Sequence, residues 1–423
     1  MKSKIVQTLS TRRFLFLLLA EIFSQLAINT YSFSLLIVVF TVANSNTAVS
    51  GAVLAFMIPT LLFGILAGVY VDRWNKKNVL FYSNMLRALP LFVLAFFHSN
   101  LLFVYFITFL IATVTQFFIP AETPIIPLLV RKDLLLSANA LFGTVVYASI
   151  FLAYAASGPL IVILGKTNIF IFLALCFLIA AFFASLIKYK ESDLHKPKLK
   201  ESLEYDFMKE LKMALGLISK TKKIYHAIFS ISLAQVLILT VAVIGPGYAR
   251  QVLKIRVEEF PLLFVTPAIA GLALGSVLIG NFLHKHDKTN LTKLGLLMVG
   301  ICMLFLPYGS KVESRTFIHA INFYLPHLLK INILHIMVFL AFLLGFAMSF
   351  VFIPANTILQ EETSDEIRGK IYGVTNSIIG AISILPVLVV GGLADVIGVK
   401  SVITGLGIVI ILIALIQFLR DRK

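Results

Sequence analysis

The chain has 423 residues, of which 59% are apolar and 13% are charged. Soluble domains have about 25% charged residues, and a soluble protein of this size could not hide so much apolar surface from water. The composition therefore excludes a soluble enzyme, a nucleic-acid-binding protein and a disordered chain. The net charge of +16 does not indicate nucleic acid, because the basic residues lie between apolar blocks and not on one compact domain.

Twelve stretches are long and apolar enough to cross a bilayer, which takes about 20 residues of helix. We therefore predict an all-α integral membrane protein with twelve transmembrane helices. The first stretch follows Arg12 and Arg13 and is too long for the core of a signal peptide, so we interpret it as an uncleaved span. The predicted spans are residues 14–42, 48–71, 78–97, 101–120, 137–164, 167–187, 224–248, 260–283, 291–309, 333–354, 371–393 and 399–419.

The distribution of lysine and arginine predicts the orientation, because cytoplasmic loops are enriched in these residues. With the N-terminus inside, 27 of the 36 lie in cytoplasmic segments or at the cytoplasmic ends of spans, eight lie in outer loops or at outer span ends, and Arg87 lies within the third span. We expect a multi-pass protein of the cell inner (plasma) membrane with both termini in the cytoplasm.

A long polar stretch and an internal repeat predict two halves. Residues 188–223 form a cytoplasmic linker with an amphipathic helix, which lies on the membrane surface or packs on the helix ends. The sequences FIPAET at 118–123 and FIPANT at 352–357 match at five of six positions, six spans apart. Parallel repeats of this kind are typical of transporters built from two bundles. We expect pseudo-symmetric six-helix bundles over 1–187 and 224–423.

The loop after the second span has a motif that points to one family. It reads GILAGVYVDRWNKK over residues 64–77, and the glycines at 64 and 68 favour close approach of a neighbouring helix. The loop resembles the signature between helices 2 and 3 of the major facilitator superfamily, although Asn75 replaces a glycine and lysines replace the usual arginines. The residues that match the signature are Gly68, Asp72, Arg73, Lys76 and Lys77.

Three shorter stretches resemble the branch of that superfamily that holds macrolide-efflux and enterobactin-exporter proteins. They lie at 120–123, 137–141 and 368–370. The resemblance covers essentially the whole chain and implies the major facilitator fold. In helix 5, only Gly158-Pro159 remains of the glycine-rich signature of proton-coupled drug exporters. This motif therefore does not establish proton antiport.

The resemblance also implies a conformational latch that holds the two halves in the outward-facing state. Asp72 would meet the N-terminus of the eleventh span near Gly369, and Arg73 or Lys76 would meet Glu122. The alternative is that the basic residues only anchor the loop on the cytoplasmic side of the membrane.

Polar residues inside the spans are candidate coupling or cavity residues, because an ionisable group in a bilayer is costly. Glu21, Gln25 and Asn29 are four apart, so they share one face of the first span. Glu21 could carry a proton, since an apolar environment favours the neutral carboxyl. It could instead pair with Arg87 at a similar depth, or extend to the interface. Further candidates, by the family's arrangement of helices, are Gln116, Tyr147, Gln235 and Asn376.

These observations predict a secondary transporter that works by alternating access. The leading function is proton-coupled efflux, as an antiporter, of an amphipathic, drug-like or siderophore-like compound. The alternatives are an importer or lysophospholipid flippase of the same fold, and a scaffold or sensor without flux. A scaffold has no need of the polar face of the first span.

The expected partners follow from this function. We expect a monomer that binds a small-molecule substrate, protons or another ion, and membrane lipid, with no nucleic acid, cofactor or metal. The chain has no HExxH, GxSxG or phosphate-loop motif. Its two cysteines, Cys176 and Cys302, lie in apolar blocks, and residues 310–332 form a long outer loop with a short interfacial helix.

Overall fold

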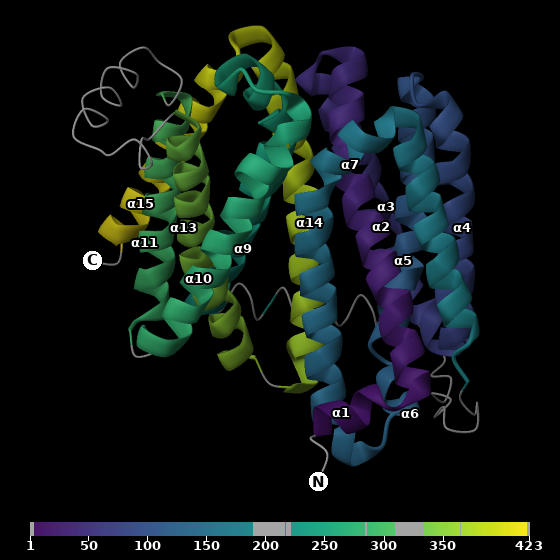
Figure 1. Cartoon of the computed structure of the whole chain (residues 1–423). Coiled ribbons are helices and arrows are strands. Elements are labelled where there is room, and N and C mark those ends of the chain that lie inside the picture. The colour runs from purple at the N-terminus through teal and green to yellow at the C-terminus, as the bar shows by residue number, and fades with distance from the viewer. Residues whose placement is uncertain are drawn as a thin grey trace, which may run out of the picture. The chain divides into compact units, whose positions relative to one another are not determined.

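The computed structural model describes residues 4–188, 216, 221–283, 286–308, 333–363 and 365–420 (Figure 1). At some helical positions, named where they matter, only the backbone is described. Almost all of the predicted linker at 188–223 and of the predicted outer loop at 310–332 lies outside the described residues. The described secondary structure is entirely helical.

The chain divides into two compact units. Unit 1 holds residues 1–43 and 51–201, and unit 2 holds residues 44–50 and 202–423. The elements in the first half of the chain are α1 (Lys4–Leu9), α2 (Arg12–Ala43), α3 (Asn46–Arg73), α4 (Lys76–Phe97), α5 (Leu101–Glu122), α6 (Ile126–Leu129), η1 (Lys132–Leu134) and α7 (Leu135–Ser185).

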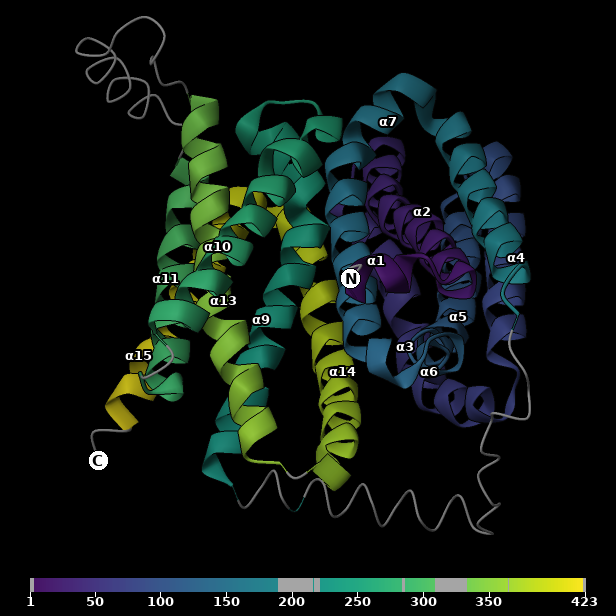
Figure 2. The ribbon, with the colours of Figure 1, turned by 60° about the horizontal axis from the view of Figure 1, so that its bottom comes forward.

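Helix α7 contains two of the predicted spans. Its 51 residues would extend roughly 77 Å at 1.5 Å per residue, far more than the ~30 Å of a bilayer core. Gly165 interrupts the helix with φ +77° and ψ 169°, a backbone conformation that glycine adopts at little cost. The chain turns there, as Figure 2 shows at the top of α7, so 137–164 and 167–187 are separate spans.

The elements of unit 2 follow in order. They are α9 (Lys222–Gly247), η3 (Tyr248–Leu253), η4 (Val257–Glu259), η5 (Pro261–Val265), α10 (Thr266–Phe282), α11 (Lys288–Phe305), η6 (Leu306–Tyr308), α13 (Ile333–Glu361), α14 (Asp365–Ile397) and α15 (Val399–Arg420). The eighth predicted span therefore begins with the wide turn η5 at Pro261 and becomes a regular helix at Thr266.

The structure confirms the predicted fold class. Eleven helices of the described part of the chain are long and apolar enough to cross a membrane, and α7 supplies two spans, which gives twelve. The tenth span continues seven residues past its predicted end at Pro354. Prolines are tolerated in membrane helices, and α13 continues through Pro354 as a regular helix.

Helix caps explain one departure from the family motif. Asn75, where the signature has a glycine, is the N-cap of α4, and its side-chain oxygen accepts a hydrogen bond from the Asn78 N–H at 3.2 Å. Asn100 and Asp287 cap α5 and α11 in the same way. Around the start of α4, one end of unit 1 is filled by an apolar cluster that includes Phe14, Leu80 and Phe118.

Candidate functional site

The three polar residues of the first span form a hydrogen-bonded ladder along α2. Asn29 Nδ2 donates to Gln25 Oε1 at 3.0 Å, and Gln25 Nε2 donates to Glu21 Oε1 at 2.7 Å. Glu21 is 1% exposed, whereas Gln25 and Asn29 are half-buried. Each amide donates toward Glu21, so the ladder is arranged to stabilise an ionised carboxylate at its end.

Arg87 is buried completely in the middle of unit 1, at 0% exposure. Its guanidinium donates from Nη2 to Ser24 Oγ at 3.1 Å and to Asn84 Oδ1 at 2.9 Å, and from Nε to the carbonyl of Ser83 at 3.2 Å. These partners belong to α2 and α4, which lie together in unit 1 (Figure 1). The hydrogen bonds satisfy most of the donors of a cation that would be very costly to bury without partners.

Two aromatic rings complete the environment of Arg87. Its Cζ lies 4.1 Å from the ring centroid of Phe118 on α5 and 4.6 Å from that of Phe177 on α7. The faces of aromatic rings attract cations, and the attraction is strongest where water is excluded. Helices α2, α4, α5 and α7 therefore all contribute to holding one positive charge inside unit 1.

Two carboxylates act on this buried cation. Glu21 and Glu122 both interact electrostatically with Arg87 and with each other. Neither is within ion-pair distance of Arg87 among the described residues. Glu21 and Arg87 are buried, whereas Glu122, at the end of α5, is half-buried. We call Glu21, Arg87 and Glu122 the buried charge cluster, with Glu122 at its partly exposed edge. With all three groups ionised it carries a net charge of −1, and one bound proton makes it neutral.

The structure groups residues that the sequence had assigned to different roles. The motif resemblance placed Glu122 in the latch, whereas here it acts electrostatically on Arg87 and Glu21. Sequence reasoning missed Ser24, Asn84 and the two aromatic rings. A signal was present, because Ser24 lies three residues after Glu21 and Asn84 lies three before Arg87, which places each of them on the same helix face as a charged residue.

The other predicted lining residues have no contact with the charge cluster among the described residues, and the side chain of one of them is not described. Gln116 is 9% exposed, and its Nε2 donates to Thr60 Oγ1 on α3 at 3.0 Å. Tyr147 is 75% exposed on the surface of unit 1, and Gln235 is half-buried on α9 of unit 2. The side chain of Asn376 lies outside the described residues.

The family motif is partly described. A Cβ at Gly64 would be 3.6 Å from Gln116 Oε1 on α5, and one at Gly68 would meet no described atom within 4 Å. The close approach of a helix at Gly68 therefore stays a prediction. Lys76 is buried, and its Nζ donates to the carbonyl of Val71, which caps the C-terminal turn of α3.

The role of the remaining latch residues stays a prediction. The side chains of Asp72 and Arg73 lie outside the description, as does the surrounding of Gly369 in the first turns of α14. Lys77 is half-buried near the start of α4.

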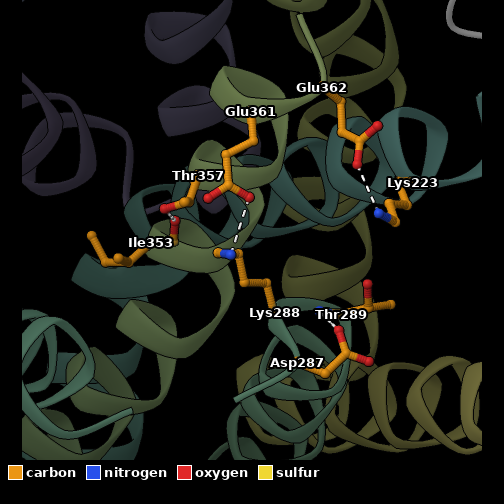
Figure 3. Close-up of polar contacts among 8 residues, drawn as sticks. All are labelled: Lys223, Asp287, Lys288, Thr289, Ile353, Thr357, Glu361 and Glu362. Atoms are coloured by element: carbon orange, nitrogen blue, oxygen red, sulfur yellow. Dashed lines mark hydrogen bonds and ion pairs between the residues drawn. The ribbon is translucent and has the colours of Figure 1, made fainter. Parts of the chain in front are cut away.

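The corresponding end of unit 2 carries exposed ion pairs instead of a buried cluster (Figure 3). Lys223 Nζ is 2.8 Å from Glu362 Oε1, and Lys288 Nζ is 3.0 Å from Glu361 Oε2. Both acids end α13, and the lysines start α9 and α11, so the pairs join three helix ends. At this exposure each pair contributes about 0–1 kcal/mol, and we assign these pairs a structural role.

Two further features do not add to the site. A cavity of about 620 Å³ on unit 1 is lined by Trp74, Tyr82, Leu86 and Phe117 among others, and it contains none of the predicted lining residues. Within the described ranges, no group of three or more His, Cys, Asp or Glu is arranged to hold a metal ion. Both cysteines are free and buried, as predicted.

Comparisons with known proteins agree on one family. Residues 17–325 match the family model described as Major Facilitator Superfamily. The chain is 24% identical over 350 residues to the putative bacilysin exporter BacE of Bacillus subtilis (strain 168), covering 82% of this chain and 79% of that protein. It is 21% identical over 379 residues to macrolide efflux protein A of Streptococcus pyogenes, covering 88% and 87%.

Solved structures share the fold. The crystal structure of the nucleoside transporter NupG aligns with a TM-score of 0.77 and covers 96% of this chain and 100% of that one, at 13% identity. At this identity the similarity establishes the fold alone.

Proposed function

The chain belongs to the major facilitator superfamily, and from this premise we propose that it exports a small organic molecule by alternating access, coupled to protons. The superfamily points to a multi-pass membrane transporter rather than an enzyme, with a small-molecule substrate. Two of its relatives are named as exporters, of bacilysin and of macrolides. We therefore propose a drug-like or amphipathic compound as the substrate, moved as in an antiporter and with a multidrug range.

The buried charge cluster is the observation that carries this proposal. Ionisable groups inside a membrane span are costly and mark ion pathways or proton relays. A purely structural bundle would be at least as stable with apolar residues of similar volume in their place. The three charges sum to −1, so one bound proton makes the cluster neutral and its release restores a single net negative charge.

The ladder on α2 offers a way to connect protonation with the rest of the helix. While Glu21 is ionised, Gln25 donates to it and Asn29 donates to Gln25. A protonated Glu21 can donate through its O–H, while its other oxygen still accepts. When the O–H points to Gln25, the Gln25 amide rotates to present its oxygen, and Asn29 then keeps only its hydrogen bond to the Gln25 carbonyl, at 2.8 Å. Protonation therefore changes the hydrogen-bonding capacity of a half-buried amide about two turns along the helix, where a substrate could sense it.

The coupling is tested by transport in proteoliposomes that contain the purified full-length protein. With an imposed pH gradient, the wild type accumulates ethidium, a cationic amphipathic dye, against its concentration gradient. We expect Glu21→Gln to abolish this uphill movement and to retain downhill exchange of the dye. Glu259→Gln is the matched control, because it makes the same substitution at a partly exposed carboxylate, which forms an ion pair with Arg256 outside the charge cluster.

Two results decide the proposal. Uphill accumulation by Glu21→Gln at the wild-type rate would refute the role of Glu21. If the wild type moves neither ethidium nor labelled erythromycin under any gradient, efflux of such compounds is wrong and the importer, flippase or scaffold alternatives take its place.

The placement in the cell belongs to the same proposal. We place the protein in the plasma membrane as a monomer with both termini in the cytoplasm, because the positive charges favour that side. The bundles would be residues 1–187 and 224–423, with Asp72, Arg73 and Gly369 forming an inner latch. Reporter fusions at the two ends test the orientation, and opposite locations of the ends would contradict it.

A further inference from the structure

The start of α3 is capped by a carboxylate from a distant part of the chain. The first N–H groups of a helix lack partners within the helix and usually bond to a nearby side chain. Asp395, near the end of α14, accepts hydrogen bonds from the backbone N–H of Asn46 at 2.8 Å and of Thr47 at 3.0 Å. It also accepts from the side chains of Ser45, Asn46 and Thr47 at 2.6, 2.9 and 2.7 Å.

Other contacts hold the same segment to the same unit. Ser50 Oγ donates to the carbonyl of Val387 at 2.7 Å, and Arg250 Nη1 donates to Asn44 Oδ1 at 2.8 Å. Gly391 permits the close approach, because a Cβ there would overlap Ser50 Oγ. Residues 44–50 therefore count with unit 2, although α3 continues into unit 1 from residue 51.

Asp395 does more than cap the first turn of α3, because it also joins this turn to α14. Ser45 is the N-cap of α3, and its Oγ accepts from the Ala48 N–H at 3.3 Å. The helix thus has a cap of its own, and the added carboxylate ties its first turn to α14. A negative charge at a helix N-terminus is attracted by the helix dipole, and the attraction acts only while the two helix ends stay together.

We propose that Asp395 is an outer latch, which holds the start of α3 to α14 while the outer side is closed and releases it when that side opens. This inference rests on the proposed alternating access. In the predicted orientation, the start of α3 and the end of α14 are both outer ends. The proposed inner latch uses Asp72, at the end of α3, toward the start of α14. Helices α3 and α14 would then each end in an aspartate that caps the other.

The test measures distances between spin labels in the purified full-length protein, in which Cys176 and Cys302 are replaced by alanine. Ser99→Cys and Lys400→Cys place labels on exposed positions at the predicted outer ends of the two halves. Lys132→Cys and His286→Cys form the corresponding inner pair. The equilibrium between short and long distances is read without any substrate.

Removal of the latch is expected to favour the form with the longer outer distance. For Asp395→Asn and Asp395→Ala, the equilibrium constant toward that form rises roughly 5-fold or more, about 1 kcal/mol, as is usual for coupled conformational equilibria. The inner pair shifts toward shorter distances. Asp133→Asn makes the same chemical change at an exposed pair with Arg131 and leaves both distributions unchanged.

A second variant separates a latch from a simple helix cap. Ser45→Asp combined with Asp395→Asn places a carboxylate at the N-cap of α3 without the tie to α14. If the combination restores the melting temperature but keeps the long outer distance populated, the latch is supported. If it restores the wild-type distances too, or if Asp395→Asn only lowers the melting temperature, Asp395 is merely a cap and the proposal is wrong.

The outcomes also separate this inference from the proposed function. If two outer distances are observed but their populations do not change on replacement of Asp395, the latch is wrong and alternating access stands. A single outer distance in the wild type and every variant would overturn the latch together with alternating access.

Discussion

Replacement of Arg87 by methionine tests whether the buried charge cluster is held together by its cation. Methionine fills much of the same volume without charge. The substitution leaves Glu21 and Glu122 inside unit 1 without the positive charge that acts on both. It also leaves Ser24 Oγ and Asn84 Oδ1 without the donor that they share.

The expected loss of stability is large. Removal of one partner from a buried charged pair costs about 3–5 kcal/mol, and each buried acceptor left without a donor adds about 1–3 kcal/mol. The loss of contact with two aromatic faces adds to this. Because neither carboxylate is in direct ion-pair contact with Arg87, we take the lower end of each range, which gives a total of about 5 kcal/mol. Arg87→Met combined with Glu21→Gln and Glu122→Gln should recover most of it, since no buried charge then remains.

The measurement is unfolding of the detergent-solubilised protein in increasing dodecyl sulfate, followed by circular dichroism. Arg131→Met is the matched control, because Arg131 is 71% exposed in its pair with Asp133. That control should change the free energy of unfolding by at most about 1 kcal/mol. If Arg87→Met were as stable as Arg131→Met, or if the triple variant were no better than the single one, the account of the cluster would be wrong.

Three further predictions concern packing and exposed charge. Gly391→Ala should lower the free energy of unfolding by about 1–3 kcal/mol through overpacking against Ser50, whereas Gly392→Ala, where a Cβ meets nothing within 4 Å, should leave it nearly unchanged; equal effects would contradict the close approach. Gly68→Ala should be neutral or stabilising by about 0.5–1 kcal/mol, as for other open helical positions, and a lower melting temperature would indicate tight packing at that face. Glu361→Gln should cost less than about 1 kcal/mol in dodecyl sulfate unfolding, and a larger loss would show that its ion pair does more than join helix ends.

The sequence predicts the fold because the bilayer imposes a simple rule on it. Each span must be long, apolar and helical, so all twelve spans can be recognised without any tertiary information. Two details of the spans, the end of the tenth and the start of the eighth, are not visible in the sequence. The tenth span passes its proline, as membrane helices can, and the eighth starts with a wide turn that hydropathy does not reveal.

The candidate site was predictable within α2 and, from similar depth in the membrane, for Glu21 with Arg87 on α4. The spacing of Glu21, Gln25 and Asn29 predicts the hydrogen-bonded ladder on α2, because residues four apart lie on the same face of a helix. The grouping of Glu122 with Arg87, and the capping of α3 by Asp395, join residues that are far apart in the chain. Such pairs depend on how the helices pack, which a single sequence does not specify.

The central claim is that the buried charge cluster carries the coupled proton, and one measurement tests it most directly. A pH-sensitive dye trapped in proteoliposomes reports whether an imposed ethidium gradient moves protons. We expect ethidium-driven proton movement in the wild type and in Glu259→Gln, and none in Glu21→Gln even though that variant still exchanges ethidium. Proton movement at the wild-type rate in Glu21→Gln would contradict the claim.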